Sequence, residues 1–307
     1  MIPRKFGFLC FFCTSCFYGT PIFKIALPYF YYCADKPLSP AIAENRLRFL
    51  QEKFHAEIPE DSPPAADFLF IPSSAIRPPD KRQGILLFCL NHPLLRFHYK
   101  YWSNYLDAGA DIILWNPKNG IQNPKNYAAV LKTILEYTRA HYPQAAICLH
   151  SHCASSDPAI AAVSEKCDPD IHLIIDRGHG DISSLVRSFP LVGYFIGEGN
   201  LDDYDCHGIH KIGTIPGKIL SLVAMHDQVM NSESGNLTRR LSERCPHQEM
   251  HEMITGDHWS YYDEETYLVM CRFMVDLGIL LHIPPYPGPS TSSSSCQVQN
   301  LARVILH

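Results

Sequence analysis

Four short runs of apolar residues are spaced along the middle of the chain. They lie at residues 84–90, 111–116, 145–150 and 171–176, and each is bounded by polar or turn-forming residues. Continuous apolar runs of this length are typical of central strands in a parallel sheet, because both faces of such a strand are buried. The pattern therefore predicts four buried β-strands.

Between the second and third of these strands, residues 123–143 have the spacing of an amphipathic helix. Val130, Ile134 and Leu135 would fall on one face of it. A strand, a helix and a further strand form a βαβ unit, and repetition of that unit requires a parallel sheet with helices on both faces. We therefore expect an α/β protein with a mostly parallel central sheet flanked by helices.

The pattern continues toward the end of the chain. Two further strands are predicted at residues 217–225 and 248–254, followed by a closing helix at 264–281. The segment 178–216 lies between the fourth and fifth strands and is longer than an ordinary connection. We expect it to hold a cap over the site, inserted before the strand that carries an acidic residue.

Both ends of the chain differ from the middle. Residues 1–34 include the uncharged stretch 6–23, which is long enough for a membrane-spanning helix, so we expect a membrane-associated segment. A cleaved signal peptide and a buried N-terminal element remain alternatives. Residues 35–79 are rich in proline and predict a connector, 80–283 form the folded domain, and 284–307 form a low-complexity tail.

The composition limits which binding partners and which cellular compartment are expected. The 307 residues are 46% hydrophobic and 19% charged, which allows a sizeable core. The net charge is −5 without a long block of Lys and Arg, so we expect no nucleic-acid partner. Twelve cysteines are spread along the chain, and Cys89 and Cys148 lie in predicted core strands, which indicates mostly free thiols in a reducing compartment. The expected localisation is thus membrane-associated, with the domain in a reducing compartment.

Polar residues follow directly after several predicted strands. In an open parallel sheet, reactive groups gather just beyond the carboxyl ends of the strands. Ser151, Asp227 and His258 occupy such ends, and they occur in that order. A serine hydroxyl needs an imidazole to accept its proton and a carboxylate to orient the imidazole, so these three residues are candidates for a catalytic triad.

The motifs around these residues resemble those of the α/β-hydrolase family. "LHSHCA" (149–154) is similar to the GHSLGG elbow, "WNPKNG" (115–120) to the NYRGxG motif, "AMHDQVM" (224–230) to the acid loop and "TGDHW" (255–259) to the histidine loop. The resemblance covers residues 80–280 and implies Ser151 as nucleophile, His258 as base and Asp227 as its orienter, with no organic cofactor or metal. The Cys- and Phe-rich start and the histidine-rich elbow also resemble the chlamydial CHLPS-protein family.

The oxyanion hole would combine the backbone N–H of His152 with that of Leu94, because Pro93 has no N–H to donate. Leu149 and Cys153 stand where the family has glycine. Two interpretations follow. The first is a serine esterase or lipase-like hydrolase that cleaves an ester or thioester, with a small, lipid-like acyl substrate, through an acyl-enzyme. The second is a catalytically degraded α/β-hydrolase-like binding or scaffold protein at a membrane.

The sixteen histidines leave a metalloenzyme as a third interpretation. Its potential zinc ligands are His150, His152, Cys153, Asp176, His179 and Asp181. No H-E-x-x-H motif and no paired C-x-x-C motif supports this interpretation. The sequence therefore favours the triad over a metal centre.

Overall fold

The structure is a computed structural model of the 307-residue chain. It describes residues 48, 51–52, 54–64, 66–89, 95–117, 124–187, 205–232, 235–245, 248–254, 256–258 and 260–288. The predicted membrane segment 1–34, Leu94, residues 188–204 of the predicted cap and residues 289–307 of the predicted tail lie outside this range. Within it, we find no helix that is both long and apolar enough to cross a membrane.

Seven strands form the central sheet. They are β1 (Ala66–Ile71), β2 (Gly84–Cys89), β3 (Ala110–Pro117), β4 (Ala146–His152), β5 (Ile171–Asp176), β6 (Ile219–Ala224) and β9 (Gln248–Met253), in the order β1-β3-β2-β4-β5-β6-β9. Strand β1 is antiparallel to β3, and every other neighbouring pair is parallel. The expected mostly parallel sheet is confirmed.

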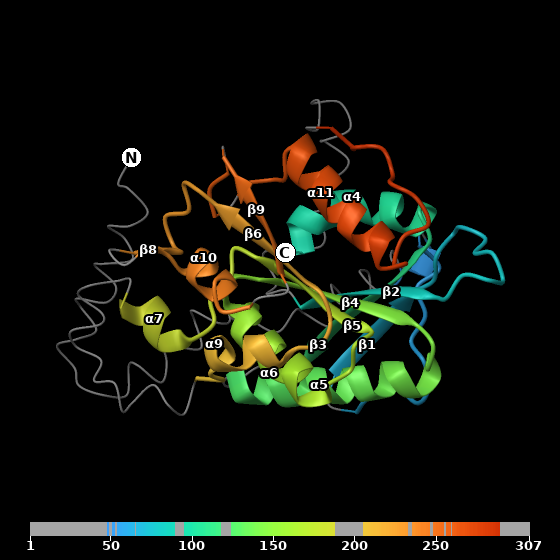
Figure 1. The fold of residues 1–307 in the computed structure, drawn as a ribbon. Helices are drawn as coiled ribbons and strands as arrows, with labels where there is room; N and C mark the ends of the chain where they lie inside the picture. Colours follow the sequence, from blue (N-terminus) through green and yellow to red (C-terminus); the bar gives the residue numbers. More distant parts are fainter. Residues whose placement is uncertain are drawn as a thin grey trace.

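Helices cover both faces of this sheet (Figure 1). Helices α4 (Leu95–Asp107) and α11 (Glu264–Asp276) lie on one face, and α5 (Pro124–His141) and α6 (Ser156–Lys166) lie on the other. The shorter described elements are η2 (Cys153–Ser155), α7 (Ile182–Arg187), α9 (Gly208–Lys211), η4 (Ile212–Thr214), β7 (Asn231–Ser232), β8 (Gly235–Asn236) and α10 (Leu237–Ser242).

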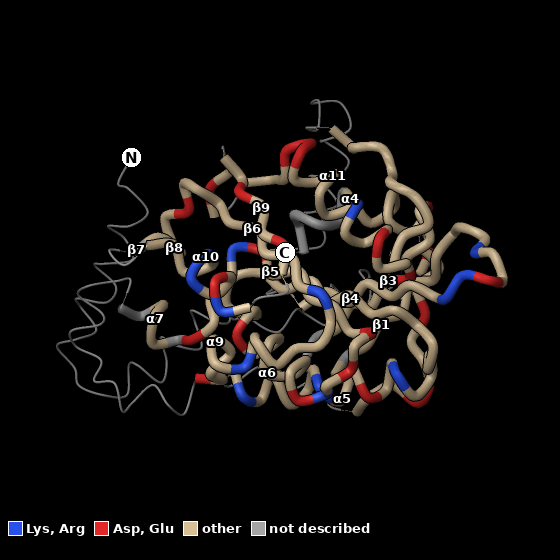
Figure 2. Tube along the Cα trace, in the orientation of Figure 1, with Lys and Arg blue, Asp and Glu red and all other residues tan. Residues whose placement is uncertain are grey.

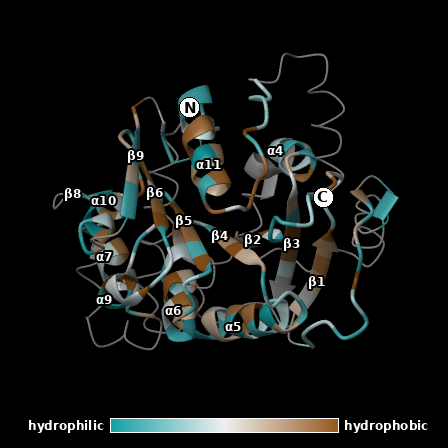
Figure 3. Ribbon diagram, turned by 45° about the vertical axis from the view of Figure 1, so that its right-hand side comes forward, coloured by the Kyte–Doolittle hydropathy of each residue, from teal (hydrophilic) through white to brown (hydrophobic). Residues whose placement is uncertain are grey.

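Alternate residues of the strands build two hydrophobic cores. On the α4 and α11 side, Leu86 and Cys148 pack with the aromatic rings of those helices, whereas on the α5 and α6 side Leu87 and Leu149 pack with aliphatic side chains. Figure 3 shows the hydrophobic residues concentrated on the strands. Because successive strand residues point to opposite faces, the continuous apolar runs in the sequence serve both cores at once.

Charged residues of both signs lie on the outer helices, while the central strands carry few (Figure 2). Lys132 of α5 pairs with Glu165 of α6 at 3.2 Å, and Lys166 of α6 pairs with Glu136 of α5. These pairs join the two helices that flank the sheet on this face. They are solvent-exposed, so each contributes little, about 0–1 kcal/mol.

Three boundaries differ from the sequence prediction. The closing helix α11 ends at Asp276, five residues before the predicted end at residue 281. Strand β1 lies within residues 35–79, which were expected to form a connector. Arg77 of the same segment donates hydrogen bonds to the Gly109 and Ile279 carbonyls of the domain at 2.7 and 2.8 Å. The sheet therefore includes part of the proline-rich region. Strand β4 extends to His152, two residues beyond the predicted end at residue 150. Ser151 therefore lies inside the strand, and the turn after the strand begins at Cys153.

Candidate active site

The turn between β4 and α6 places Cys153 in a sharp bend. Cys153 has a φ of +53°, in the left-handed region that non-glycine residues adopt rarely and at a cost of about 1–2 kcal/mol. The extended His152 precedes it, Cys153 itself begins the 3₁₀ turn η2, and helix α6 follows directly after that turn. A strand, a residue with positive φ and a helix together form the geometry of a nucleophile elbow. Cys153 is partly exposed and its thiol is free.

Small residues on both sides allow this bend. Ser155, two residues after Cys153, accepts a hydrogen bond from the His152 N–H at 3.0 Å and donates to the Cys89 carbonyl at the end of β2. Ser151, two residues before it, lies inside β4 and is fully buried. The elbow "SHCAS" (151–155) is thus centred on Cys153, and its side chains tie the turn to the neighbouring strand.

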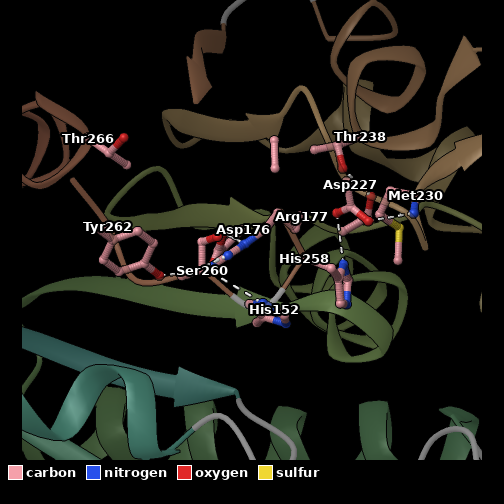
Figure 4. Close-up of polar contacts among 12 residues, drawn as sticks. His152, Asp176, Arg177, Asp227, Met230, Thr238, His258, Ser260, Tyr262 and Thr266 are labelled. Carbon is pink, nitrogen blue, oxygen red and sulfur yellow. Dashed lines mark hydrogen bonds and ion pairs between the residues drawn. The ribbon is translucent and has the colours of Figure 1, made fainter. Parts of the chain in front are cut away.

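His258 and Asp227 face one another beside this elbow (Figure 4). The Nδ1 atom of His258 lies 2.8 Å from Oδ2 of Asp227, and both side chains are buried. The other oxygen of Asp227 accepts hydrogen bonds from the Val229 and Met230 N–H groups, each at 2.8 Å. The carboxylate is therefore held by its own loop and fixes the ring orientation and tautomer of His258.

Cys153 and His258 are electrostatically coupled. One donor atom from each of His152, Cys153 and His258 lies within 4.8 Å of the other two. Burial acts to lower the pKa of His258, but the charge of Cys153 and the hydrogen bonds to Asp227 and Cys153 outweigh it and raise the pKa to about 10. The environment thus favours the protonated form of His258, with its ring beside the Cys153 sulfur.

The loop that carries His258 is held by a buried arginine. Arg177 follows β5, also has a positive φ of +48°, and donates from Nη1 to the carbonyls of Asp257 and Ser260 at 3.0 and 2.8 Å. Its Nε and Nη2 donate to the Asp176 carboxylate at 2.7 and 2.8 Å. Burial acts to raise the pKa of Asp176, but the charge of Arg177 holds it well below its usual range. Arg177, itself held by the ion pair with Asp176 at the end of β5, thus fixes the chain on both sides of His258.

Two histidines of β4 lie beneath the site. His150 is within 3.2 Å of the Tyr262 hydroxyl, which itself donates to Asp176 at 2.7 Å. His152 is fully buried, and its Nε2 lies 3.7 Å from Oδ2 of Asp176. Burial lowers the pKa of His150 to about 4 and that of His152 well below its usual range, so both rings are neutral at neutral pH.

The structure brings together two of the three residues predicted as a triad, Asp227 and His258. It places the Ser151 hydroxyl elsewhere, because β4 is longer than predicted: Ser151 lies within the strand and donates to the Ile174 carbonyl of β5 at 3.0 Å. The N–H of His152, predicted as an oxyanion donor, is directed to Ser155 instead. Leu94, the second predicted donor, lies outside the described residues.

Cys153 is the site residue that the sequence prediction placed in a different role. The sequence already contained an indication of an elbow centred on Cys153. Leu149 is an unsuitable neighbour for a nucleophile at Ser151, whereas small residues stand two positions before and after Cys153. The metal ligands considered from the sequence also separate. Asp176 is bound to Arg177, and within the described residues the compact group is His152, Cys153 and His258.

Comparisons with known proteins were made on sequence and on structure. No family model and no curated protein matches the sequence. Est1E from Butyrivibrio proteoclasticus matches the structure with 13% identity and a TM-score of 0.55, over 69% of this chain and 94% of that chain. Esterase 2 of Thermogutta terrifontis, phosphonylated by sarin, matches with 13% identity and a TM-score of 0.51, over 74% of this chain and 96% of that chain.

A protein from Klebsiella pneumoniae subsp. pneumoniae MGH 78578, described as a dienelactone hydrolase, has 11% identity and a TM-score of 0.50, over 73% of this chain and 97% of that chain. The chain therefore has the α/β-hydrolase fold, as predicted. The neighbours are described as esterases and a hydrolase, in agreement with the expected esterase-like class. At these identities the likeness concerns the fold, and none of these findings bears on the resemblance to the chlamydial CHLPS-protein family.

Proposed function

We propose that this chain is a hydrolase that cleaves an ester or thioester through an acyl-enzyme on Cys153. The observation that carries this proposal is the position of Cys153, at positive φ on the strand–helix elbow and next to the hydrogen-bonded pair of His258 and Asp227. Relative to the triad predicted from the sequence, the acid and the base are unchanged. The nucleophile moves from Ser151 to Cys153.

The reaction follows from this geometry. His258 takes the thiol proton of Cys153, the sulfur attacks the acyl carbon, and negative charge develops on the carbonyl oxygen. The backbone N–H of Ala154, directly after the nucleophile and at the start of the helical segment, is suited to stabilise that charge. His258 then gives its proton to the leaving alcohol or thiol. It next takes a proton from water, which attacks the thioester and releases the acid and Cys153.

The arrangement of Cys153, His258 and Asp227 favours a hydrolase over the alternative of a catalytically degraded binding protein. Cys153 keeps a costly positive φ beside the hydrogen-bonded pair of His258 and Asp227, an arrangement that covalent catalysis uses. A lipid-like acyl substrate, attachment to a membrane through residues 1–34 and membership of the chlamydial CHLPS-protein family remain part of the proposal. Their support is the composition of the N-terminal segment and the apolar stretch 189–197 of the expected cap.

The test compares four purified full-length proteins on a panel of aryl esters and acyl thioesters: the wild type, Cys153→Ala, His258→Ala and Ser151→Ala. We expect Cys153→Ala and His258→Ala to lower kcat/KM by about 10³-fold or more, as the loss of a triad member does. Ser151→Ala is the matched control and should stay within a few fold of the wild type. A loss of activity in Ser151→Ala alone would return the nucleophile to Ser151, and no turnover by folded wild type on any acyl compound would support the binding module.

A further inference from the structure

Three side chains with metal-binding atoms converge at the elbow. The donor atoms of His152, Cys153 and His258 lie within 4.8 Å of one another, and they come from two separate segments of the chain. Figure 4 shows the rings of His152 and His258 next to one another, and their centroids are 5.1 Å apart. Imidazole nitrogen and cysteine sulfur are the ligands that zinc prefers, whereas magnesium and calcium prefer oxygen.

His258 already has the orientation of a metal ligand. Its Nδ1 faces Oδ2 of Asp227 at 2.8 Å, so a metal would bind at Nε2. Histidine ligands of zinc typically donate a hydrogen bond from their other ring N–H to a carboxylate, which fixes the ring and strengthens the ligand. Asp227 supplies this contact in advance and is itself held by the Val229 and Met230 N–H groups.

The buried ring of His152 independently indicates a ligand site. Its ring is fully buried, and neither of its nitrogens has a hydrogen-bond partner in the part of the chain that the structure describes. A buried imidazole without such partners is unfavourable, so its presence beside the nucleophile calls for a ligand or another role. The proposed hydrolysis does not use this ring. A bound metal ion would satisfy one of its nitrogens.

We propose that His152, Cys153 and His258 form a binding site for Zn²⁺, and that the bound ion inhibits the enzyme by occupying the nucleophile. Coordination replaces the proton held between the Cys153 sulfur and Nε2 of His258 by bonds to zinc and releases that proton to solvent, with no change in oxidation state. Zinc holds its ligands at about 2.0–2.3 Å, so the three side chains close on the ion by small rotations, and water takes the fourth position. The inhibition rests on the proposed function, but the binding does not.

The test begins with binding. Isothermal titration of metal-free, full-length protein with ZnCl₂ should show one site per chain, and Co²⁺ should give the charge-transfer absorption of a cobalt–thiolate bond. His152→Gln should weaken Zn²⁺ binding at least about 100-fold, because loss of an outer partner alone costs 10- to 100-fold. His210→Gln, an exposed histidine outside the site, is the matched control and should bind as the wild type does. Cys153→Ala should lose the cobalt–thiolate absorption.

Inhibition is measured on the same preparations. Wild-type esterase activity should fall with Zn²⁺ at the concentration that saturates the site, and a chelator should restore it, whereas Mg²⁺ should have no effect. Absence of one-to-one binding, unchanged affinity in a folded His152→Gln, or activation by Zn²⁺ would each overturn the proposal. Zinc binding by a metal-free chain that hydrolyses nothing would support the site and count against the proposed function alone.

Discussion

Replacing Arg177 by methionine tests how the His258 loop is held. The substitution keeps an unbranched side chain but removes the guanidinium. Two hydrogen bonds to the Asp176 carboxylate and two to the carbonyls of Asp257 and Ser260 are lost. The side chains of Arg177 and Asp176 are 1% and 0% exposed, so water does not replace these bonds.

The magnitude follows from this burial. Removing one partner of a buried ion pair leaves the other charge uncompensated and costs about 3–5 kcal/mol. The free energy of unfolding of a typical domain is about 5–15 kcal/mol, so Arg177→Met should remain folded but lose a large part of its stability. With a urea m-value of about 2–3 kcal/mol/M, the midpoint should fall by about 1–2.5 M. Because the loop also carries His258, kcat should fall more than KM rises.

A double-mutant cycle with Asp176→Asn isolates the ion pair. In the double variant the unpaired charge is absent, so the combined loss should be smaller than the sum of the two single losses by about 2 kcal/mol or more. Arg272→Met, at an exposed position of α11, is the matched control and should shift stability by less than about 0.5 kcal/mol. A loss below about 1 kcal/mol in Arg177→Met, or strict additivity in the cycle, would refute the role of Arg177 in holding the His258 loop.

Three further outcomes are expected. Burial lowers the pKa of His172 from 6.5 to about 4, so as the pH falls His172 is protonated in the unfolded chain before it is protonated in the folded chain. Lowering the pH from 7 to 5 should therefore reduce the free energy of unfolding by about 2 kcal/mol through His172. In urea unfolding, His172→Gln should show a pH dependence smaller by that amount. Ser155→Ala should leave the His152 N–H and the Cys89 carbonyl without a partner and cost about 1–3 kcal/mol in urea unfolding, with unchanged stability counting against the elbow contacts. Gly217→Ala would drive a methyl group into the Ile171 carbonyl and should lower stability by about 1–3 kcal/mol, whereas an unchanged melting temperature would contradict this packing.

The sheet was predictable because its strands are buried on both faces. The run at 145–150 shows this, since Cys148 and Leu149 serve opposite cores and both must be apolar. Strand β1 escaped prediction because it follows a proline-rich stretch and pairs antiparallel at the sheet edge, a partnership that no local pattern reveals. Its neighbour β3 lies about forty residues further along the chain.

The sequence predicted the neighbouring pair of Asp227 and His258, but it did not predict that Cys153, rather than Ser151, would lie beside them. Asp227 and His258 each follow a strand whose end was predicted closely, and the structure joins them at 2.8 Å. The end of β4 was placed two residues too early, because Ser151 and His152 are polar and polar residues usually end a buried strand. Ser151 is accommodated inside the sheet by its hydrogen bond to the Ile174 carbonyl, and the neighbouring His150 by its contact with the Tyr262 hydroxyl.

The most direct test of the central claim is to trap the acyl-enzyme and locate it. The wild type and Ser151→Ala would each be mixed with an activated aryl ester, quenched in acid within the first turnover and digested for mass spectrometry. We predict a hydroxylamine-sensitive acyl group on Cys153 in both proteins, and none in Cys153→Ala. An acyl group on Ser151 in the wild type, absent from Ser151→Ala while Cys153 remains unmodified, would contradict the account.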